Sequence, residues 1–226
     1  MFKGFKVTQR LKGTSLAISA LFLLVFAISC SQDKEPDQKY HEVKDFTVKY
    51  DINGPKEGHK TIYSQDWGRC VVQVTETQKT ISLMEDGEQY IVSIDLTKNT
   101  GTRMKNPIYK QLIESMDAKT PKEFNQGLLE KMGGKVVGEK KIAGNDCKEW
   151  ELMNGVQKTC ITEDGIILES VSNISGTEAG EIATELNRNS KGGIDACDTG
   201  DAKIEEIDIN QMLQKQNTDQ KPQTEE

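Results

Sequence analysis

The chain has 226 residues and a formal net charge of −7, with 29 Lys and Arg against 36 Asp and Glu. This length is enough for one domain with a hydrophobic core. The acidic balance argues against a nucleic-acid partner, because phosphate binding depends on Lys and Arg that displace counterions. Apolar residues make up 35% of the chain, which suits a sheet with one face in water.

The N-terminus has the parts of a bacterial export signal. No acid occurs before residue 13, and the basic residues there are Lys3, Lys6, Arg10 and Lys12. An apolar run from Leu16 to Ile28 follows, too short to span a bilayer comfortably. It ends in the small residues before Cys30 and turns polar directly afterwards. This pattern resembles a bacterial lipobox, in which the Cys30 thiol is acylated and becomes the first residue of the mature chain.

The sequence therefore predicts a signal peptide over residues 1–29, lipid attachment at Cys30 and a flexible tether over residues 30–42. The alternatives are ordinary signal-peptidase cleavage with an incidental Cys, or a retained membrane anchor. Cleavage leaves 25 basic and 36 acidic residues, a net charge of about −11. Such a chain offers no basic patch for anionic headgroups, so membrane attachment depends on the acyl chains.

Localisation follows from the same segment. Ser31 after the acylated Cys permits transfer to the outer membrane, so we expect an envelope protein anchored there and facing the periplasm. The acidic stretch over residues 32–35 leaves surface export open as an alternative.

Four cysteines remain in the mature chain: Cys70, Cys147, Cys160 and Cys197. An even number in an exported chain favours two disulfides. A zinc site is the competing interpretation, but no C-x-x-C spacing occurs, and neither His41 nor His59 is near a Cys.

A hairpin argument favours one pairing. A two-residue turn at Asn154-Gly155 places Glu149 opposite Cys160, with Cys147 one diagonal step away. A bulge at Gly155 would bring the two cysteines into direct opposition instead. Either arrangement joins Cys147 to Cys160 and leaves Cys70 for Cys197.

The first half of the chain predicts an antiparallel meander. Apolar and polar residues alternate in strands near residues 46–52, 59–64, 70–74, 81–83 and 90–96. Asp86-Gly87 tolerates positive φ and suits a tight hairpin. Short turns of this kind join only antiparallel strands.

Two amphipathic helices follow, over residues 107–116 and 121–132. Thr120, Pro121 and Glu123 form a helix start signal, and Gly133-Gly134 ends the helix. Strands resume over residues 135–137, 148–152, 156–162, 166–171 and 181–186. The predicted β domain covers residues 43–206, and residues 207–226 predict a short helix and a disordered polar tail.

The fold class expected is mainly β (α+β): a strongly curved antiparallel sheet. We expect an unclosed half-barrel of about 9–11 strands wrapped around two short helices, because a sheet this long must curl, close or be covered. No nucleotide-binding, zinc-protease or nucleophile-elbow motif occurs, so we expect no enzyme, no cofactor and no metal. Seven residues could line a ligand cavity, although filling a core is the favoured interpretation of them: Phe46, Val48, Tyr50, Tyr90, Val92, Ile94 and Trp150.

The middle of the chain resembles a known family. The segments Thr61–Gly68 and Tyr90–Met104, with Ala143–Cys147 later, resemble bacterial exported proteins with the domain of unknown function DUF4412. The match covers about residues 43–206. That family is similar in architecture to the lipoprotein-localisation factors LolA and LolB, whose unclosed barrels hold acyl chains in an apolar cavity. No ligand-gripping residue of those factors has a counterpart in this sequence.

The resemblance and the lipobox together favour a non-catalytic, lipid-anchored module that binds lipid or another hydrophobic ligand, such as the acyl chains of another lipoprotein. The alternative is a structural or protein-interaction lipoprotein of the envelope without a ligand, whose protein partner is unknown.

Overall fold

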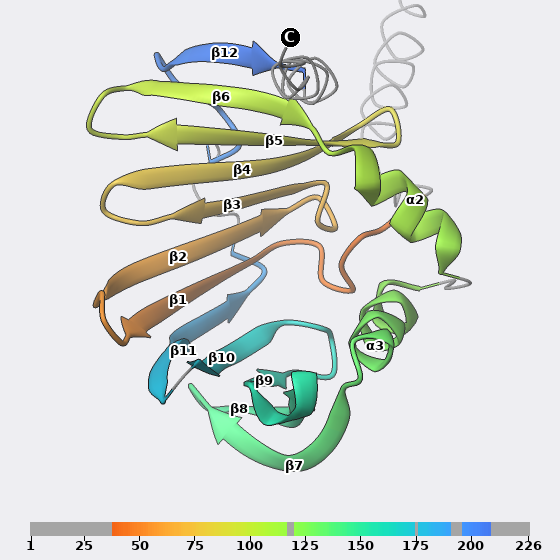
Figure 1. Cartoon of the computed structure of the whole chain (residues 1–226). Coiled ribbons are helices and arrows are strands. Elements are labelled where there is room, and N and C mark those ends of the chain that lie inside the picture. The colour runs from red at the N-terminus through yellow and green to blue at the C-terminus, as the bar shows by residue number, and fades with distance from the viewer. Residues whose placement is uncertain (1–37, 117–119, 175, 191–195, 209–226) are drawn as a thin grey trace, which may run out of the picture. The chain divides into compact units, whose positions relative to one another are not determined.

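The computed structural model describes residues 38–116, 120–174, 176–190 and 196–208, and it contains one sheet of twelve strands with two short α-helices (Figure 1). The predicted signal peptide, Cys30 and the polar tail lie outside the described residues. The strands are β1 (Phe46–Asn53), β2 (Gly58–Gln65), β3 (Cys70–Val74), β4 (Gln78–Glu85), β5 (Glu88–Asp95), β6 (Thr100–Lys105), β7 (Lys135–Ile142), β8 (Asn145–Leu152), β9 (Gln157–Ile161), β10 (Ile167–Ile174), β11 (Thr177–Arg188) and β12 (Lys203–Ile207). The helices are α2 (Pro107–Ser115) and α3 (Pro121–Lys131), with a 3-10 turn η2 (Met153–Gly155).

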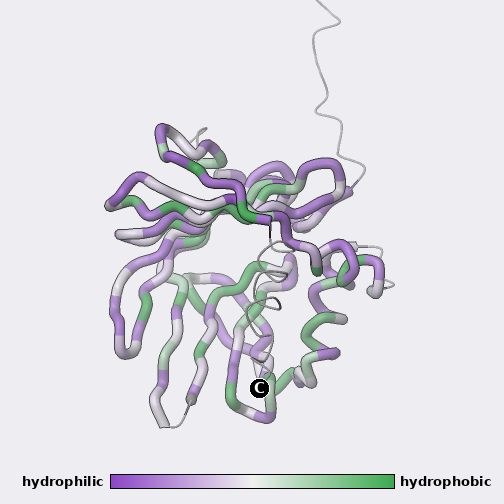
Figure 2. The backbone as a smooth tube through the Cα atoms, turned by 45° about the horizontal axis from the view of Figure 1, so that its top comes forward, coloured by the Kyte–Doolittle hydropathy of each residue, from purple (hydrophilic) through white to green (hydrophobic). Residues whose placement is uncertain are grey.

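The strand order is β12-β6-β5-β4-β3-β2-β1-β11-β10-β9-β8-β7. The β1–β11 pair joins the two meanders into one sheet, which curves around without closing (Figures 1 and 2). Lys140 on β7 forms ion pairs with Glu149 on β8 and Glu169 on β10, although β8 and β9 separate β7 from β10. A flat sheet would hold β7 and β10 about 14 Å apart, so the sheet is strongly curved there. The expected fold class is confirmed.

One strand departs from the expected antiparallel arrangement. β12 pairs with β6 in parallel, Ile204 lying opposite Gly101. Parallel neighbours cannot be joined by a short turn, and β6 and β12 are connected through both helices and strands β7–β11. The last part of this connection, between Arg188 and Lys203, joins β11 to β12, and we call it the crossover. This pair also takes the sheet to twelve strands instead of the expected 9–11.

Two buried clusters form the core. The first joins β1 to the second meander, with these buried members: Phe46, Val48, Tyr50, Ile142, Cys147, Cys160, Ile166, Leu168 and Ala183. The second covers one face of the first meander, with these buried members: Cys70, Val72, Ile81, Val92 and Ile94. Ala196, Cys197 and Ala202 pack against the second cluster, so the crossover to β12 shields that face from water.

Local signals set the turns and helix starts. The Thr120 hydroxyl accepts a hydrogen bond from the Glu123 N–H at 3.2 Å, and Pro121 occupies the first turn, as predicted. Asp86 and Gly87 adopt φ of 51° and 77° between the paired residues Glu85 and Glu88, which is the expected two-residue hairpin.

The turn at Asn154 differs from the prediction. A four-residue connection containing η2 replaces the two-residue turn, since Leu152 pairs with Gln157. The pairing register is nevertheless the expected one, with Glu149 opposite Cys160.

The chain contacts the sheet earlier than the expected start at Val43. The N–H groups of Tyr40 and His41 both donate to the Trp67 carbonyl, at 2.8 and 2.9 Å. The His41 ring stacks on Phe46, with ring centroids 5.3 Å apart. The end of the predicted tether therefore packs on the β2–β3 turn.

Candidate functional site

The four mature cysteines form two disulfides. Cys147 on β8 bonds Cys160 on β9 with a Cα–Cα distance of 5.5 Å, along the diagonal of the hairpin. Cys70 on β3 bonds Cys197 in the crossover, with a Cα–Cα distance of 6.3 Å. The second bond joins the crossover to the face of the first meander that carries the second core cluster.

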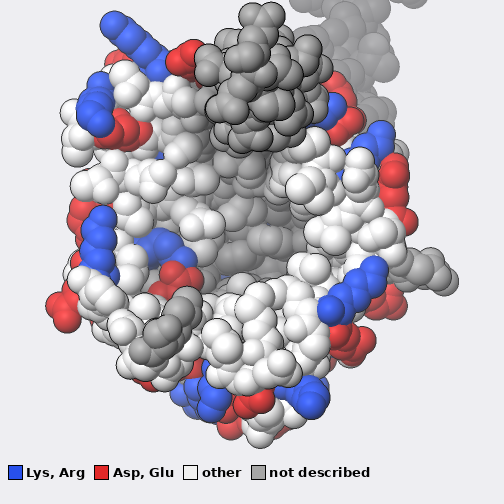
Figure 3. Space-filling view, viewed as in Figure 1, with Lys and Arg blue, Asp and Glu red and all other residues white. Residues whose placement is uncertain are grey.

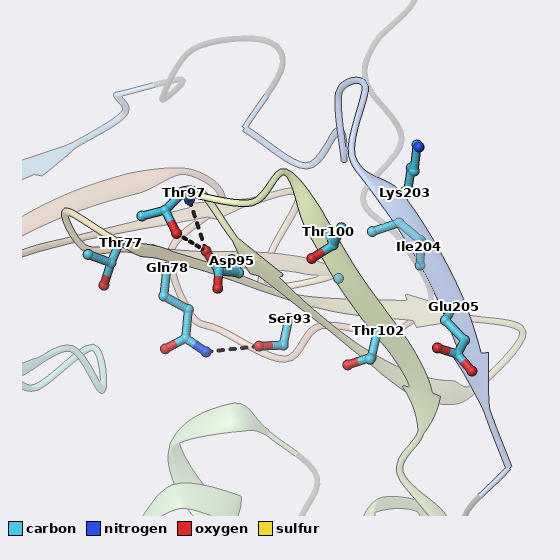
Figure 4. Close-up of a pocket in the computed structure, with 11 residues that line it drawn as sticks. Thr77, Gln78, Ser93, Asp95, Thr97, Thr100, Thr102, Lys203, Ile204 and Glu205 are labelled. Atoms are coloured by element: carbon cyan, nitrogen blue, oxygen red, sulfur yellow. Dashed lines mark hydrogen bonds between the residues drawn. The ribbon is translucent and has the colours of Figure 1, made fainter.

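The opposite face of the first meander is the one that carries Val48 of the first core cluster. It lies on the inner side of the curved sheet, which we call the hollow, and Figure 3 shows the molecule hollowed at its centre. Strand register fixes which residues share this face. Gln73 lies opposite Thr80, which lies opposite Ser93, and the row continues through Thr102 to Glu205. Figure 4 shows Gln78, Ser93 and Thr102 pointing from the strands towards the side on which a green helix lies. The crossover packs on the other face, through Ala196, Cys197 and Ala202.

The side chains on the hollow face change from mainly apolar to mainly polar with distance from α2 along the strands. One row nearer α2 contains Val71, Ile91 and Met104, each partly buried, with Ser82 between Val71 and Ile91. The rows farther from α2 contain uncharged hydrogen-bonding side chains together with the charged Asp95, Lys203 and Glu205. We call the uncharged set the polar floor: Gln73, Gln78, Thr80, Ser93, Thr100 and Thr102.

Most of the polar floor borders a cavity of about 750 Å³ at the β12 edge of the sheet (Figure 4). Asp95, Lys203 and Glu205 border it too. The Asp95 carboxylate accepts hydrogen bonds from the Thr97 hydroxyl and from Lys98, and these contacts hold the pKa of Asp95 well below its usual range. Asp95 is therefore ionised and already bonded to its own turn.

A second cavity, of about 650 Å³, lies between α3 and strands β7–β9. Its apolar lining consists of Leu129 on α3, Val136 on β7, Trp150 on β8 and Ile161 on β9. Lys148 also borders this cavity and forms no ion pair with any residue that the structure describes. The volume lies in the range of small-molecule pockets, and the lining combines apolar walls with charged residues of both signs: Lys122, Lys140, Lys141, Lys148, Glu139, Asp146 and Glu163.

Neither helix buries its apolar stripe. Both helices lie beside the curved sheet in Figure 1, and no residue of α2 or α3 is buried. Leu112 and Ile113 on α2, with Phe124, Leu128 and Leu129 on α3, remain partly exposed. An amphipathic helix normally buries this stripe against a core. The two helices therefore cover the sheet without filling the space beside it.

The seven sequence-predicted cavity candidates separate into two groups. Phe46, Val48, Tyr50, Val92 and Ile94 are at most 5% exposed and belong to the core clusters. Tyr90 borders a cavity of about 450 Å³ beside α2, and Trp150 borders the α3 cavity.

The residues that line the two larger cavities were mostly missed by sequence reasoning. Part of the signal for the polar floor was present, because polar residues alternate with apolar ones around Thr80 on β4 and Ser93 on β5. The polar half of such a pattern ordinarily indicates a side that faces bulk water. Only the curvature of the sheet turns that side into the wall of a hollow.

Two further residues with displaced pKa values, His41 and Tyr50, line none of these three cavities. Burial lowers the pKa of His41 to about 4, and its Nδ1 lies 2.9 Å from the Ser64 hydroxyl. Burial also raises the pKa of Tyr50, whose hydroxyl donates to the Ile167 carbonyl at 2.6 Å. Within the described residues no group of three His, Cys, Asp or Glu could hold a metal ion. The same part of the chain has no helix long and apolar enough to cross a membrane.

No protein-family model matches the chain, and neither does any curated protein. Among solved structures it is similar to an uncharacterized conserved protein from Thermus thermophilus, with a TM-score of 0.51 and 11% identity over 74% of this chain and 92% of that one. What the two share is the fold.

Two further structures have lower scores. The MucA/MucB complex of Pseudomonas aeruginosa has a TM-score of 0.41 and 13% identity over 72% of this chain and 58% of that one. A putative outer membrane lipoprotein-sorting protein domain from Vibrio parahaemolyticus has a TM-score of 0.32 and 8% identity over 68% of this chain and 89% of that one.

Proposed function

We propose that the protein is a non-catalytic envelope module that binds a hydrophobic ligand such as an acyl chain, and that lipid on Cys30 anchors it, in the outer membrane facing the periplasm. The observation that carries the proposal is the incomplete burial of α2 and α3, which leaves their apolar stripes partly exposed beside a hollow sheet. Exposed apolar surface of this kind marks ligand grooves and interaction sites.

The α3 cavity is the best candidate for the ligand chain. Leu129, Trp150 and Ile161 supply an apolar wall, and Lys148 gives an anionic headgroup a cation at the rim that no described residue pairs. A ligand that covers Leu129 and Val136 would bury apolar area that now contacts water, which stabilises the complex by about 25 cal/mol per Å².

Two measurements test the proposal. The full chain purified from its host membrane should carry lipid in native mass spectrometry. A brominated fatty acid should then quench Trp150, measured in a Trp67→Phe background because the chain has two tryptophans. Leu129→Asp should weaken binding at least tenfold, since a buried Leu contributes about 1.5–3 kcal/mol. Leu96→Asp is the matched control, because Leu96 is 42% exposed and lies outside the α3 cavity. A protein that is always empty and shows no quenching would refute the proposal.

One observation favours the alternative of a protein-interaction lipoprotein. β7 is an edge of the sheet, and it carries Val136 and Val137, which are 51% and 49% exposed. An open edge strand can accept a strand from a partner. Crosslinking that recovers one dominant protein through β7, from lipid-free samples, would support this function over ligand binding.

A further inference from the structure

The polar floor has hydrogen-bonding capacity that the protein itself does not use. The hydroxyls of Thr80, Thr100 and Thr102 have no hydrogen-bond partner within the part of the chain that the structure describes. Gln78 donates from Nε2 to the Ser93 hydroxyl at 2.9 Å, which leaves the Gln78 carbonyl oxygen as an acceptor and the Ser93 O–H as a donor. Gln78, Ser93, Thr100 and Thr102 line the 750 Å³ cavity, and Thr80 lies beside them as the cross-strand partner of Ser93.

The arrangement comes from several strands rather than from one loop. Thr80 on β4, Ser93 on β5 and Thr102 on β6 are cross-strand partners in one row. Neighbouring strands lie about 4.8 Å apart, so these side chains repeat at that spacing across the floor. A ligand with several hydroxyls could bond two or three of them at once.

The charges beside the floor select against anions. Asp95 and Glu205 are carboxylates at the cavity border, and Lys203 is the cation beside them. A phosphate or carboxylate headgroup would meet two like charges there, which disfavours its binding. Uncharged donors and acceptors fit a neutral, hydroxyl-rich group better.

We propose that the polar floor binds the neutral, sugar-type head group of an amphiphile, while the apolar chain lies along Val71, Ile91 and Met104 in the adjoining row. This inference goes beyond the proposed function, because the polar floor borders a different cavity from the α3 cavity and suits a neutral head group. It names the chemical class of this second ligand: a glycolipid-like molecule whose hydroxyls bond Thr80, Ser93 and Thr102.

The test compares three probes on the full chain by calorimetry, each below its micelle-forming concentration. Dodecyl maltoside carries the chain and the sugar. Dodecyl octaethylene glycol ether carries the same chain with a neutral head that has only one hydroxyl, at its end. Maltose carries the sugar alone. Dodecyl maltoside should bind the wild-type protein at least tenfold more tightly than the glycol ether, because two or more neutral hydrogen bonds to ligand each contribute a few-fold in affinity.

The variants Thr80→Val and Thr102→Val each remove one hydroxyl with little change in shape. Each should weaken dodecyl maltoside binding about threefold to tenfold and leave the glycol ether unaffected. Thr61→Val is the matched control, because Thr61 pairs with Val74 on the opposite face of the sheet. Circular dichroism of each variant verifies that it folds.

The outcomes separate the two proposals. Equal affinity for both dodecyl probes, or variants that weaken both equally, would overturn the sugar-head inference and leave hydrophobic binding intact. Binding of maltose that Thr102→Val weakens, with no gain from the dodecyl chain, would overturn the placement of the apolar chain along Val71, Ile91 and Met104. Binding of none of the three probes would overturn the inference, and the brominated fatty acid then decides the proposed function separately.

Discussion

Removal of the Cys70–Cys197 disulfide should destabilise the protein more than removal of Cys147–Cys160. The two bonds close loops with sequence separations of 127 and 13 residues. In the chain-entropy description the stabilisation grows with the logarithm of loop length, which gives about 5 kcal/mol for the long loop and about 3 kcal/mol for the short one.

The burial of the cysteine side chains reduces the expected difference in stability between the two double variants. Cys160 is fully buried and Cys147 is 4% exposed, whereas Cys197 is only partly buried. Replacement by alanine therefore removes more buried sulfur at the short loop, at a cost on the order of 1 kcal/mol. The net difference expected between the two double variants is about 1–2 kcal/mol.

The assay is urea unfolding of full chains purified from an oxidising compartment. Cys70→Ala/Cys197→Ala should show the lower midpoint. It should also expose the cluster around Val72 and Ile81, because the crossover is no longer fastened to the sheet. Stronger binding of a dye for exposed apolar surface would report this. A lower midpoint for Cys147→Ala/Cys160→Ala would refute the loop-length reasoning.

Two other perturbations have defined outcomes. Because the folded pKa of His41 is about 4, the unfolded chain takes up the proton first as pH falls below 6.5, so stability should decrease between pH 6.5 and 4 by up to about 3 kcal/mol. His41→Asn should flatten that decrease in urea titrations, and an unchanged slope would contradict the assignment. Gly101→Ala should cost about 1–3 kcal/mol in thermal unfolding, since its Cβ would lie 2.5 Å from the Ser93 carbonyl oxygen. Gly138→Ala, with the nearest atom at 3.7 Å, is the control, and equal melting shifts in both would count against the steric argument.

The sequence was informative wherever structure is decided locally. Asp86-Gly87 set a hairpin through its positive φ, and Thr120 with Pro121 set the start of α3. The register that places Glu149 opposite Cys160 also followed from the short connection between the two strands.

Non-local pairing was harder to foresee. The segment Lys203–Ile207 has no clear period-two pattern, and its partner β6 lies about 100 residues earlier. Nothing in that segment indicates a parallel pairing, because the crossover and the Cys70–Cys197 bond bring it there. The polar floor was missed for a related reason. A Thr or Ser on the wet side of a strand has the same sequence pattern whether the sheet is flat or curved.

The packing of Tyr40 and His41 on the β2–β3 turn limits how far an anchored protein can reach. Only the seven residues 31–37 separate Cys30 from Gln38, the first residue that the structure describes. Fully extended, they span roughly 25 Å. If Cys30 is acylated, the protein samples a layer a few nanometres deep, where a membrane-borne ligand has a high effective concentration. The ligand then exchanges between the protein and the bilayer without leaving the membrane surface. A modest intrinsic affinity is therefore enough to keep the hollow occupied.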